Sequence, residues 1–224
     1  MKKRIKVTTI LIILLILVSF VIGVYAYFNI EGDKIASHWD VAGEVNDYMP
    51  KFWGIFLFPL ILVGVYLLFL FIPKIDPLKK NIEKFRKYYD LFILIMILFF
   101  FYVFLLSILA NFGYAFNMTI LITPPIGVLF IFIGLIMKKL KRNWFIGIRT
   151  PWTLSSDKVW EKTHRLGGIL FMVSGIIVLA ALFFPSKYLL LFMLIPIFIL
   201  IMVLILYSYF LYRKTEKPLK NKKK

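Results

Sequence analysis

Charged residues divide the chain into long apolar segments. No Asp, Glu, Lys or Arg occurs in residues 7–28, 52–73, 91–137, 166–186 or 188–212. Each segment reaches or exceeds the ~20 residues that an α-helix needs to cross a hydrocarbon core. Backbone groups in lipid must find hydrogen-bond partners inside the protein, so the pattern predicts membrane-spanning helices.

Two of the apolar regions contain a predicted turn. Residues 91–137 are too many for one crossing, and the polar run 111–117 (Asn-Phe-Gly-Tyr-Ala-Phe-Asn) separates two helices. Pro185 and Lys187 separate the last two helices. The apolar run of residues 7–28 exceeds the ~7–15 residues of a signal-peptide core, so we expect it to be retained as a helix. The prediction is an all-α membrane protein, a six-transmembrane-helix bundle.

The composition supports a membrane protein. Apolar residues make up 62% of the 224 residues and the mean hydropathy is +0.89, whereas soluble domains contain roughly 45–50% apolar residues. This excludes soluble, fibrous and disordered classes of protein. The absence of cysteine excludes disulfides and thiolate zinc sites.

The net charge of +17 is unevenly distributed. In the six-helix arrangement, 25 of the 28 Lys and Arg residues lie in the two tails and in loops 74–90 and 138–165, and all 11 acidic residues lie in loops or tails. The positive-inside rule therefore predicts a multi-pass cell-membrane protein with cytoplasmic N and C termini. Orientation and contact with anionic lipid account for the charge, so we expect no direct binding of nucleic acid.

The loops also suggest a division of the chain. The predicted parts are an N-terminal two-helix unit (1–73) with an extracytoplasmic loop (29–51), a cytoplasmic loop (74–90), a four-helix membrane unit (91–212) with a cytoplasmic loop (138–165), and a basic cytoplasmic tail (213–224).

Four glycines predict one helix–helix contact. Gly127 and Gly134 are seven residues apart in one predicted helix, and Gly168 and Gly175 are seven apart in another. Residues at this spacing lie near one helix face, and small residues allow two helices to approach closely in a membrane. We expect these two faces to contact each other.

The extracytoplasmic loop (29–51) admits two interpretations. Its His and acidic residues have the chemistry of metal ligands; they are His38, Asp40, Glu44 and Asp47. Alternatively, Asp40 and Gly43 shape a turn while His38 and Trp39 pack against the helix ends. The second interpretation is favoured because one histidine with scattered acids is a weak metal signal. The prediction is no metal and no cofactor.

The cytoplasmic loop (138–165), which we call the elbow, contains several residues that predict its local structure. Thr150 precedes a proline and should be extended. Thr153, Ser155 or Ser156 can cap the following helix, in which Trp160 and His164 share a face. One interpretation is an interfacial turn with tryptophans at headgroup depth and arginines on lipid phosphates. The other is a docking surface for a cytoplasmic partner, and both can hold.

Both loops resemble known families. From Trp144 to Gly168 the chain contains Ile-Gly-Ile-Arg-Thr-Pro-Trp-Thr-Leu followed by Trp-Glu-Lys-Thr-His-Arg, which resembles the signature of the SdpI family, immunity proteins for a sporulation-delaying killing peptide. Ile-Ala-Ser-His-Trp-Asp at residues 35–40, followed by Gly43, is similar to the extracytoplasmic motif of a domain of unknown function (DUF1648). The matched cytoplasmic residues, which we expect to bind a partner, are Arg149, Thr150, Pro151, Trp152, Trp160, Glu161, His164 and Arg165; the matched outer residues are His38, Trp39, Asp40 and Gly43.

The resemblance implies a function that composition does not. It implies a membrane protein that protects its host from a membrane-active peptide and, in the best-known member, sequesters a cytoplasmic repressor. The alternative is a transporter or exporter of a hydrophobic substrate that uses the proline-broken helices, although no charged residue lies at membrane depth to couple ions. An enzyme would need His38 or His164 to meet a nucleophile or a metal. We expect a non-catalytic protein.

Overall fold

The computed structural model describes the backbone of residues 7–221 and the side chains of residues 7–215. Six of the described helices are long and apolar enough to cross a membrane, which confirms the predicted six-helix fold class. They are α1 (Val7–Asn29), α2 (Lys51–Ile75), α4 (Arg86–Asn111), α5 (Met118–Met137), α7 (Asp157–Ala180) and α8 (Leu189–Asn221).

The predicted turns separate these helices. Between α4 and α5 the chain reverses through Gly113, whose φ is +90°. Asn117 then caps α5, because its side-chain oxygen accepts a hydrogen bond from the N–H of Ile120 at 2.9 Å. A single-turn 3₁₀ helix (Ala181–Phe183) follows α7, and Pro185 precedes another (Ser186–Tyr188) that leads into α8.

Residues 29–51, expected to be an extracytoplasmic loop, contain a β-hairpin that the sequence did not predict. β1 (Lys34–Trp39) pairs antiparallel with β2 (Val45–Pro50), with an irregular register around His38. The strands escaped prediction because β2 contains Asn, Asp and Pro, which are all depleted in strands. Two short helices also lie within predicted loops, α3 (Lys79–Lys84) and α6 (Pro151–Ser155).

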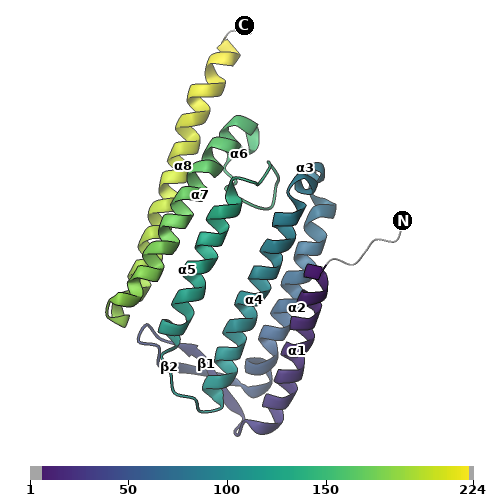
Figure 1. The fold of residues 1–224 in the computed structure, drawn as a ribbon, viewed down its shortest axis with the longest axis vertical. Helices are drawn as coiled ribbons and strands as arrows, with labels where there is room; N and C mark the ends of the chain where they lie inside the picture. Colours follow the sequence, from purple (N-terminus) through teal and green to yellow (C-terminus); the bar gives the residue numbers. More distant parts are fainter. Residues whose placement is uncertain (1–6, 222–224) are drawn as a thin grey trace, which may run out of the picture.

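The long helices pack in two groups of three. One group is α1, α2 and α4, and the other is α5, α7 and α8 (Figure 1). The sequence assigned α4 to the four-helix unit of residues 91–212, whereas in the structure α4 packs mainly against α1 and α2. The hairpin lies across one end of the molecule and contacts α2 and α4, and α3 and α6 lie at the opposite end. We call these the hairpin end and the elbow end.

The predicted glycine contact is confirmed, and it lies between α5 and α7. A Cβ built on Gly134 would lie 2.5 Å from the carbonyl oxygen of Gly168, and one built on Gly175 would lie 2.6 Å from that of Gly127. The two backbones therefore touch where these glycines lie, and no larger side chain fits between them.

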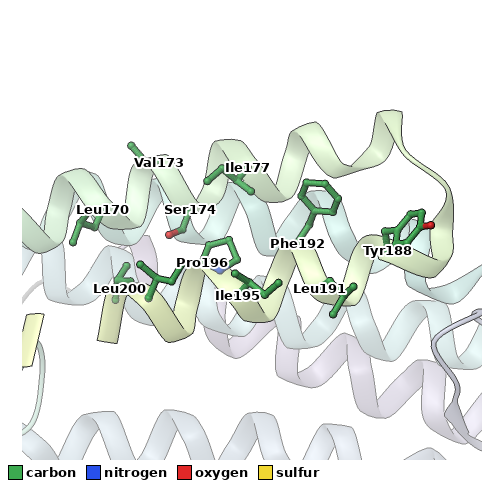
Figure 2. A pocket seen from close by; sticks show the side chains of 11 residues that line it. Leu170, Val173, Ser174, Ile177, Tyr188, Leu191, Phe192, Ile195, Pro196 and Leu200 are labelled. Carbon is green, nitrogen blue, oxygen red and sulfur yellow. The ribbon is translucent and has the colours of Figure 1, made fainter. Parts of the chain in front are cut away.

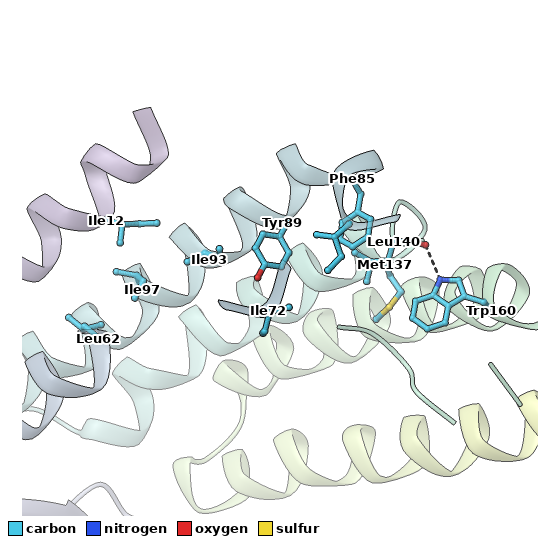
Figure 3. Packing of buried hydrophobic residues seen from close by; sticks show 11 residues of the cluster. Ile12, Leu62, Ile72, Phe85, Tyr89, Ile93, Ile97, Met137, Leu140 and Trp160 are labelled. Atoms are coloured by element: carbon cyan, nitrogen blue, oxygen red, sulfur yellow. Dashed lines mark hydrogen bonds between the residues drawn. The ribbon is translucent and has the colours of Figure 1, made fainter. Parts of the chain in front are cut away.

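An apolar cluster joins the two helix groups at the elbow end. Figure 3 shows Ile72 of α2 and Tyr89 of α4 in the same cluster as Met137 of α5 and Trp160 of α7, and all four side chains are buried. The elbow is therefore fixed to both groups.

Candidate functional site

Two capped turns set the path of the elbow. Thr150 is extended, as predicted, with φ −97° and ψ 161°. Its hydroxyl oxygen accepts a hydrogen bond from the N–H of Thr153 at 3.2 Å, and the Thr153 hydroxyl oxygen accepts one from the N–H of Thr150 at 2.9 Å. This reciprocal capping box starts α6. Of the three residues that the sequence offered as caps for the next helix, Ser156 caps α7.

Trp160 and His164 lie on one face of α7, as their spacing predicts. Their rings stack with centroids 3.9 Å apart, and each residue is 1% exposed. The Trp160 indole N–H donates to the carbonyl of Leu140 at 2.9 Å (Figure 3). The pair therefore forms the buried centre of the elbow.

Both nitrogens of His164 are used in the structure. Nε2 accepts a hydrogen bond from the N–H of Ile148 at 3.0 Å, and Nδ1 lies 2.8 Å from the carbonyl oxygen of Trp160. An imidazole that accepts at Nε2 and donates at Nδ1 is the neutral tautomer with its proton on Nδ1. Gly147 gives this ring its space, because its φ is +109° and a Cβ there would overlap Nε2. His164 thus has a structural role.

Asp76, which follows α2, binds the elbow, and the sequence reasoning missed it. It is 2% exposed, and its carboxylate accepts hydrogen bonds from the N–H of Leu78 at 2.6 Å and from the N–H of Trp144 at 2.9 Å. One carboxylate thereby ties the turn after α2 to the elbow. The sequence signal was available, since Asp before Pro at the end of an apolar segment favours a turn.

We expect Asp76→Ala to detach the elbow from the end of α2. The variant leaves the amide groups of Leu78 and Trp144 without their acceptor, which costs about 1–3 kcal/mol per buried group. Hydrogen exchange at the Trp144 amide should accelerate, whereas Glu83→Ala, which removes an exposed acid of α3, should leave it unchanged. Equal hydrogen-exchange rates at the Trp144 amide in the two variants would show that the Asp76 carboxylate does not hold the elbow.

The elbow is also fastened to α8. The Thr150 hydroxyl donates to the hydroxyl oxygen of Ser208 at 3.1 Å, and Ser208 donates to the carbonyl of Ile205 at 2.9 Å. The Trp152 ring meets the Tyr209 ring edge-on, with centroids 5.0 Å apart. The last helix is thereby held in the same hydrogen-bonded and aromatic network as α7.

The structure separates the predicted partner-binding residues into two sets. Thr150, Trp160 and His164 are buried in the elbow, so they position neighbouring groups and offer no surface to a partner. The accessible set is exposed, apart from a half-buried Trp152; it comprises Arg149, Pro151, Trp152, Glu161 and Arg165. Contact between these five residues and a partner stays a prediction.

The elbow end carries a basic surface. All five lysines of the elbow and all five lysines between residues 74 and 87 are exposed. Glu161 neutralises one of them, because its carboxylate lies 3.0 Å from the ammonium of Lys141. Such a surface suits anionic headgroups or an acidic protein.

The hairpin is fixed to the loop between α4 and α5. The side chain of Asn111 pairs with the backbone of Ala36, accepting from its N–H at 2.7 Å and donating to its carbonyl at 3.0 Å. Asn117 donates to the carbonyl of Ala42, and the Thr119 hydroxyl donates to that of Asp40 at 3.3 Å. The hairpin thereby contacts both helix groups.

For the loop of residues 29–51, the favoured interpretation is confirmed at the turn that Asp40 and Gly43 shape. The N–H of Gly43 donates to the carbonyl of Asp40 at 2.9 Å, and the Asp40 carboxylate accepts from the N–H of Glu44 at 3.0 Å. Gly43 has a φ of +83°, and a Cβ there would overlap Asn117. His38 Nδ1 lies 2.5 Å from the side-chain oxygen of Asn46. Among the described side chains, those of residues 7–215, no three His, Asp or Glu gather as a metal site requires.

A cavity of about 550 Å³ lies beneath the hairpin, and we call it the hairpin cavity. Its walls come from both helix groups and include Phe58 of α2, Ser107 of α4, Thr119 of α5 and Met193 of α8, while residues 37–41 and Asn46 cover it. A second hollow of about 480 Å³ lies between α7 and α8 and is almost entirely apolar (Figure 2). We call it the α7/α8 groove.

Comparison with known proteins confirms the predicted resemblances. Residues 139–208 match the SdpI/YfhL protein family, and residues 14–63 match a domain of unknown function, DUF1648. The chain is similar to the immunity protein SdpI of Bacillus subtilis (strain 168), with 27% identity over 202 residues that cover 90% of this chain and 94% of that protein. No solved structure matches. With its six apolar helices, the chain is a multi-pass membrane protein.

Proposed function

We propose that this chain is a non-catalytic membrane protein that protects its host from a membrane-active peptide. The observation that carries the proposal is the extent of the similarity to an immunity protein, which spans 90% of the chain. The two family matches include most of the elbow and the whole hairpin. In the elbow, the buried side chains of Thr150, Trp160 and His164 bond other side chains or the backbone, which is typical of a structural element.

The proposal includes an orientation across the membrane. The charge distribution supports an orientation with both termini and the elbow in the cytoplasm and the hairpin outside. The hairpin would then face a peptide that arrives from the exterior. The basic elbow end would lie against the anionic inner leaflet.

A cytoplasmic regulator is a second partner in the proposal. Hydrogen bonds connect the elbow to the end of α2, to α7 and to α8. The accessible residues of the elbow would therefore present a surface of fixed shape to a partner. The double variant Arg149→Ala, Arg165→Ala removes two exposed charges from this surface. The same change at Lys80 and Lys84, exposed lysines of α3, is the matched control in a pull-down from cytosol. Retention of the partner by the elbow variant would refute docking at these arginines.

Survival of cells under peptide challenge tests protection directly. A host strain lacking the gene is challenged with a panel of membrane-active peptides, with and without the gene restored. We expect restoration to raise the concentration of at least one peptide needed to stop growth. Gly134→Leu, which disturbs the contact between α5 and α7, is the destabilised variant for comparison, and we expect it to protect less than wild type.

Equal sensitivity of the two strains to every peptide would refute protection. Equal protection by wild type and Gly134→Leu would instead show that protection does not need the close contact of α5 with α7. An energy-dependent extrusion of peptide from the cells would favour the transporter alternative. Protection by binding requires no such export.

A further inference from the structure

The hairpin cavity lies between parts of the chain that are far apart in sequence. Phe58 and Ser107 come from one helix group, Thr119 and Met193 from the other, and the hairpin covers them. At the opposite end of the molecule an apolar cluster packs between the groups and leaves a smaller hollow of about 200 Å³ beside Phe92 of α4 and Met137 of α5. Of these two hollows between the groups, the one at the hairpin end is the larger, at about 550 Å³.

The lining of the cavity combines an apolar interior with polar groups at one side. Phe58, Val103, Ile122 and Met193 supply apolar surface, and the hairpin supplies hydroxyl, imidazole, carboxylate and amide groups through residues 37, 38, 40 and 46. The hydroxyl-bearing Ser107 of α4 also lines the cavity and is 4% exposed. A ligand with one apolar and one polar side would satisfy both surfaces.

The hairpin gives this end of the molecule a negative charge. Residues 29–51 contain five acids and two lysines, and one of these, Lys51, already donates to the carbonyl of Ile30. Asp40 lines the cavity, and Asp47 lies opposite His38 in the hairpin register. Every other loop that carries charge is more basic than acidic. The negative charge thus gathers beside the cavity.

We infer that the hairpin cavity binds a cationic amphipathic peptide, with apolar side chains inside the cavity and Lys or Arg beside Asp40 and Asp47. Membrane-active peptides carry this pairing of an apolar face with a basic face. Negative charge at the site steers such a peptide and selects against anionic ones. The inference rests on the proposed function and specifies where the peptide binds.

A pair of neighbouring residues allows a controlled test of the cavity. Leu190 lines the hairpin cavity and Leu191 lines the α7/α8 groove, so the same Leu→Trp change fills one hollow or the other. The protein is placed in phosphatidylcholine nanodiscs with a labelled synthetic Lys/Leu amphipathic helix as probe, and empty nanodiscs give the background. We expect Leu190→Trp to weaken binding by about tenfold or more, the loss that follows when a buried anchor is excluded. Leu191→Trp should bind like wild type.

The charge is tested by a second pair of variants. Asp40→Asn with Asp47→Asn removes two charges beside the cavity, while Glu31→Gln with Asp33→Asn removes two from the start of the hairpin. We expect the first pair to weaken binding of the Lys/Leu probe and its dependence on salt, and the second to do so less. A Glu/Leu probe should bind wild type more weakly than the Lys/Leu probe.

The outcomes separate the inference from the proposed function. The inference is refuted if wild type binds the Lys/Leu probe no better than empty nanodiscs, if Leu190→Trp binds like wild type, or if both Trp variants lose binding equally. It is also refuted if the two pairs of charge-removing variants weaken binding of the Lys/Leu probe equally, or if wild type binds the Glu/Leu probe as tightly as the Lys/Leu probe. The survival experiment uses none of these variants, so protection of cells can stand while the assigned cavity fails.

Discussion

Gly134→Leu is expected to lower the stability of the protein more than any lipid-facing substitution. A Cβ at this position would lie 2.5 Å from the carbonyl oxygen of Gly168 and 2.9 Å from the backbone nitrogen of Met172. Backbone atoms cannot rotate away, so α5 and α7 must separate along their closest contact. Overpacking of this kind costs about 3 kcal/mol. Gly175→Leu should act similarly, because its Cβ would lie 2.6 Å from the carbonyl oxygen of Gly127.

The control for this prediction is Gly64→Leu. Gly64 lies within α2, and a Cβ there would have no atom within 4 Å. Thermal unfolding of the purified protein in detergent should give a clearly lower Tm for Gly134→Leu and a nearly unchanged Tm for Gly64→Leu. Equal Tm values for the two variants would contradict the close contact of α5 with α7.

Trp160→Ala should have the second large effect. The side chain is 1% exposed, packs in the cluster that joins both helix groups and donates to the carbonyl of Leu140. Replacing a buried tryptophan by alanine costs about 3–5 kcal/mol. His164, which stacks on the ring, would also lose its neighbour. We expect the elbow to become accessible to protease as well as the Tm to fall.

Trp144→Ala provides the comparison within the same loop. Its side chain is 49% exposed, so its removal should change stability by no more than about 0.5 kcal/mol. The backbone N–H of residue 144 can still donate to Asp76. Similar losses in Trp160→Ala and Trp144→Ala would mean that the elbow is not organised around a buried Trp160.

The sequence predicted the helices because lipid imposes a simple rule. A segment that crosses hydrocarbon must be long, apolar and helical, so the absence of charge was sufficient to find all six. The α5–α7 contact was predictable for a related reason, since glycines on one face serve close packing in membranes. The helices that pack against α4 were not predictable, because its apolar side chains fit many neighbours equally well.

The two ends of the molecule were harder to predict. The hairpin depends on tertiary hydrogen bonds from Asn111, Asn117 and Thr119, which lie far away in the chain. Its own sequence has weak strand propensity. In the elbow, sequence spacing placed Trp160 beside His164, but helical spacing alone does not say whether that face is buried or exposed. The role of Asp76 was missed because its partner, the Trp144 amide, comes from another loop, and no local pattern indicates that contact.

The orientation of the two ends is tested most directly by single-cysteine variants, because the chain has no cysteine of its own. Glu44→Cys places a thiol on the exposed tip of the hairpin, and Lys158→Cys places one on the exposed start of α7 at the elbow end. A membrane-impermeant maleimide should label the hairpin variant in intact cells and the elbow variant only after the membrane is opened. Labelling of the elbow variant in intact cells, with the hairpin variant protected, would contradict an external hairpin and with it the proposed site for an arriving peptide.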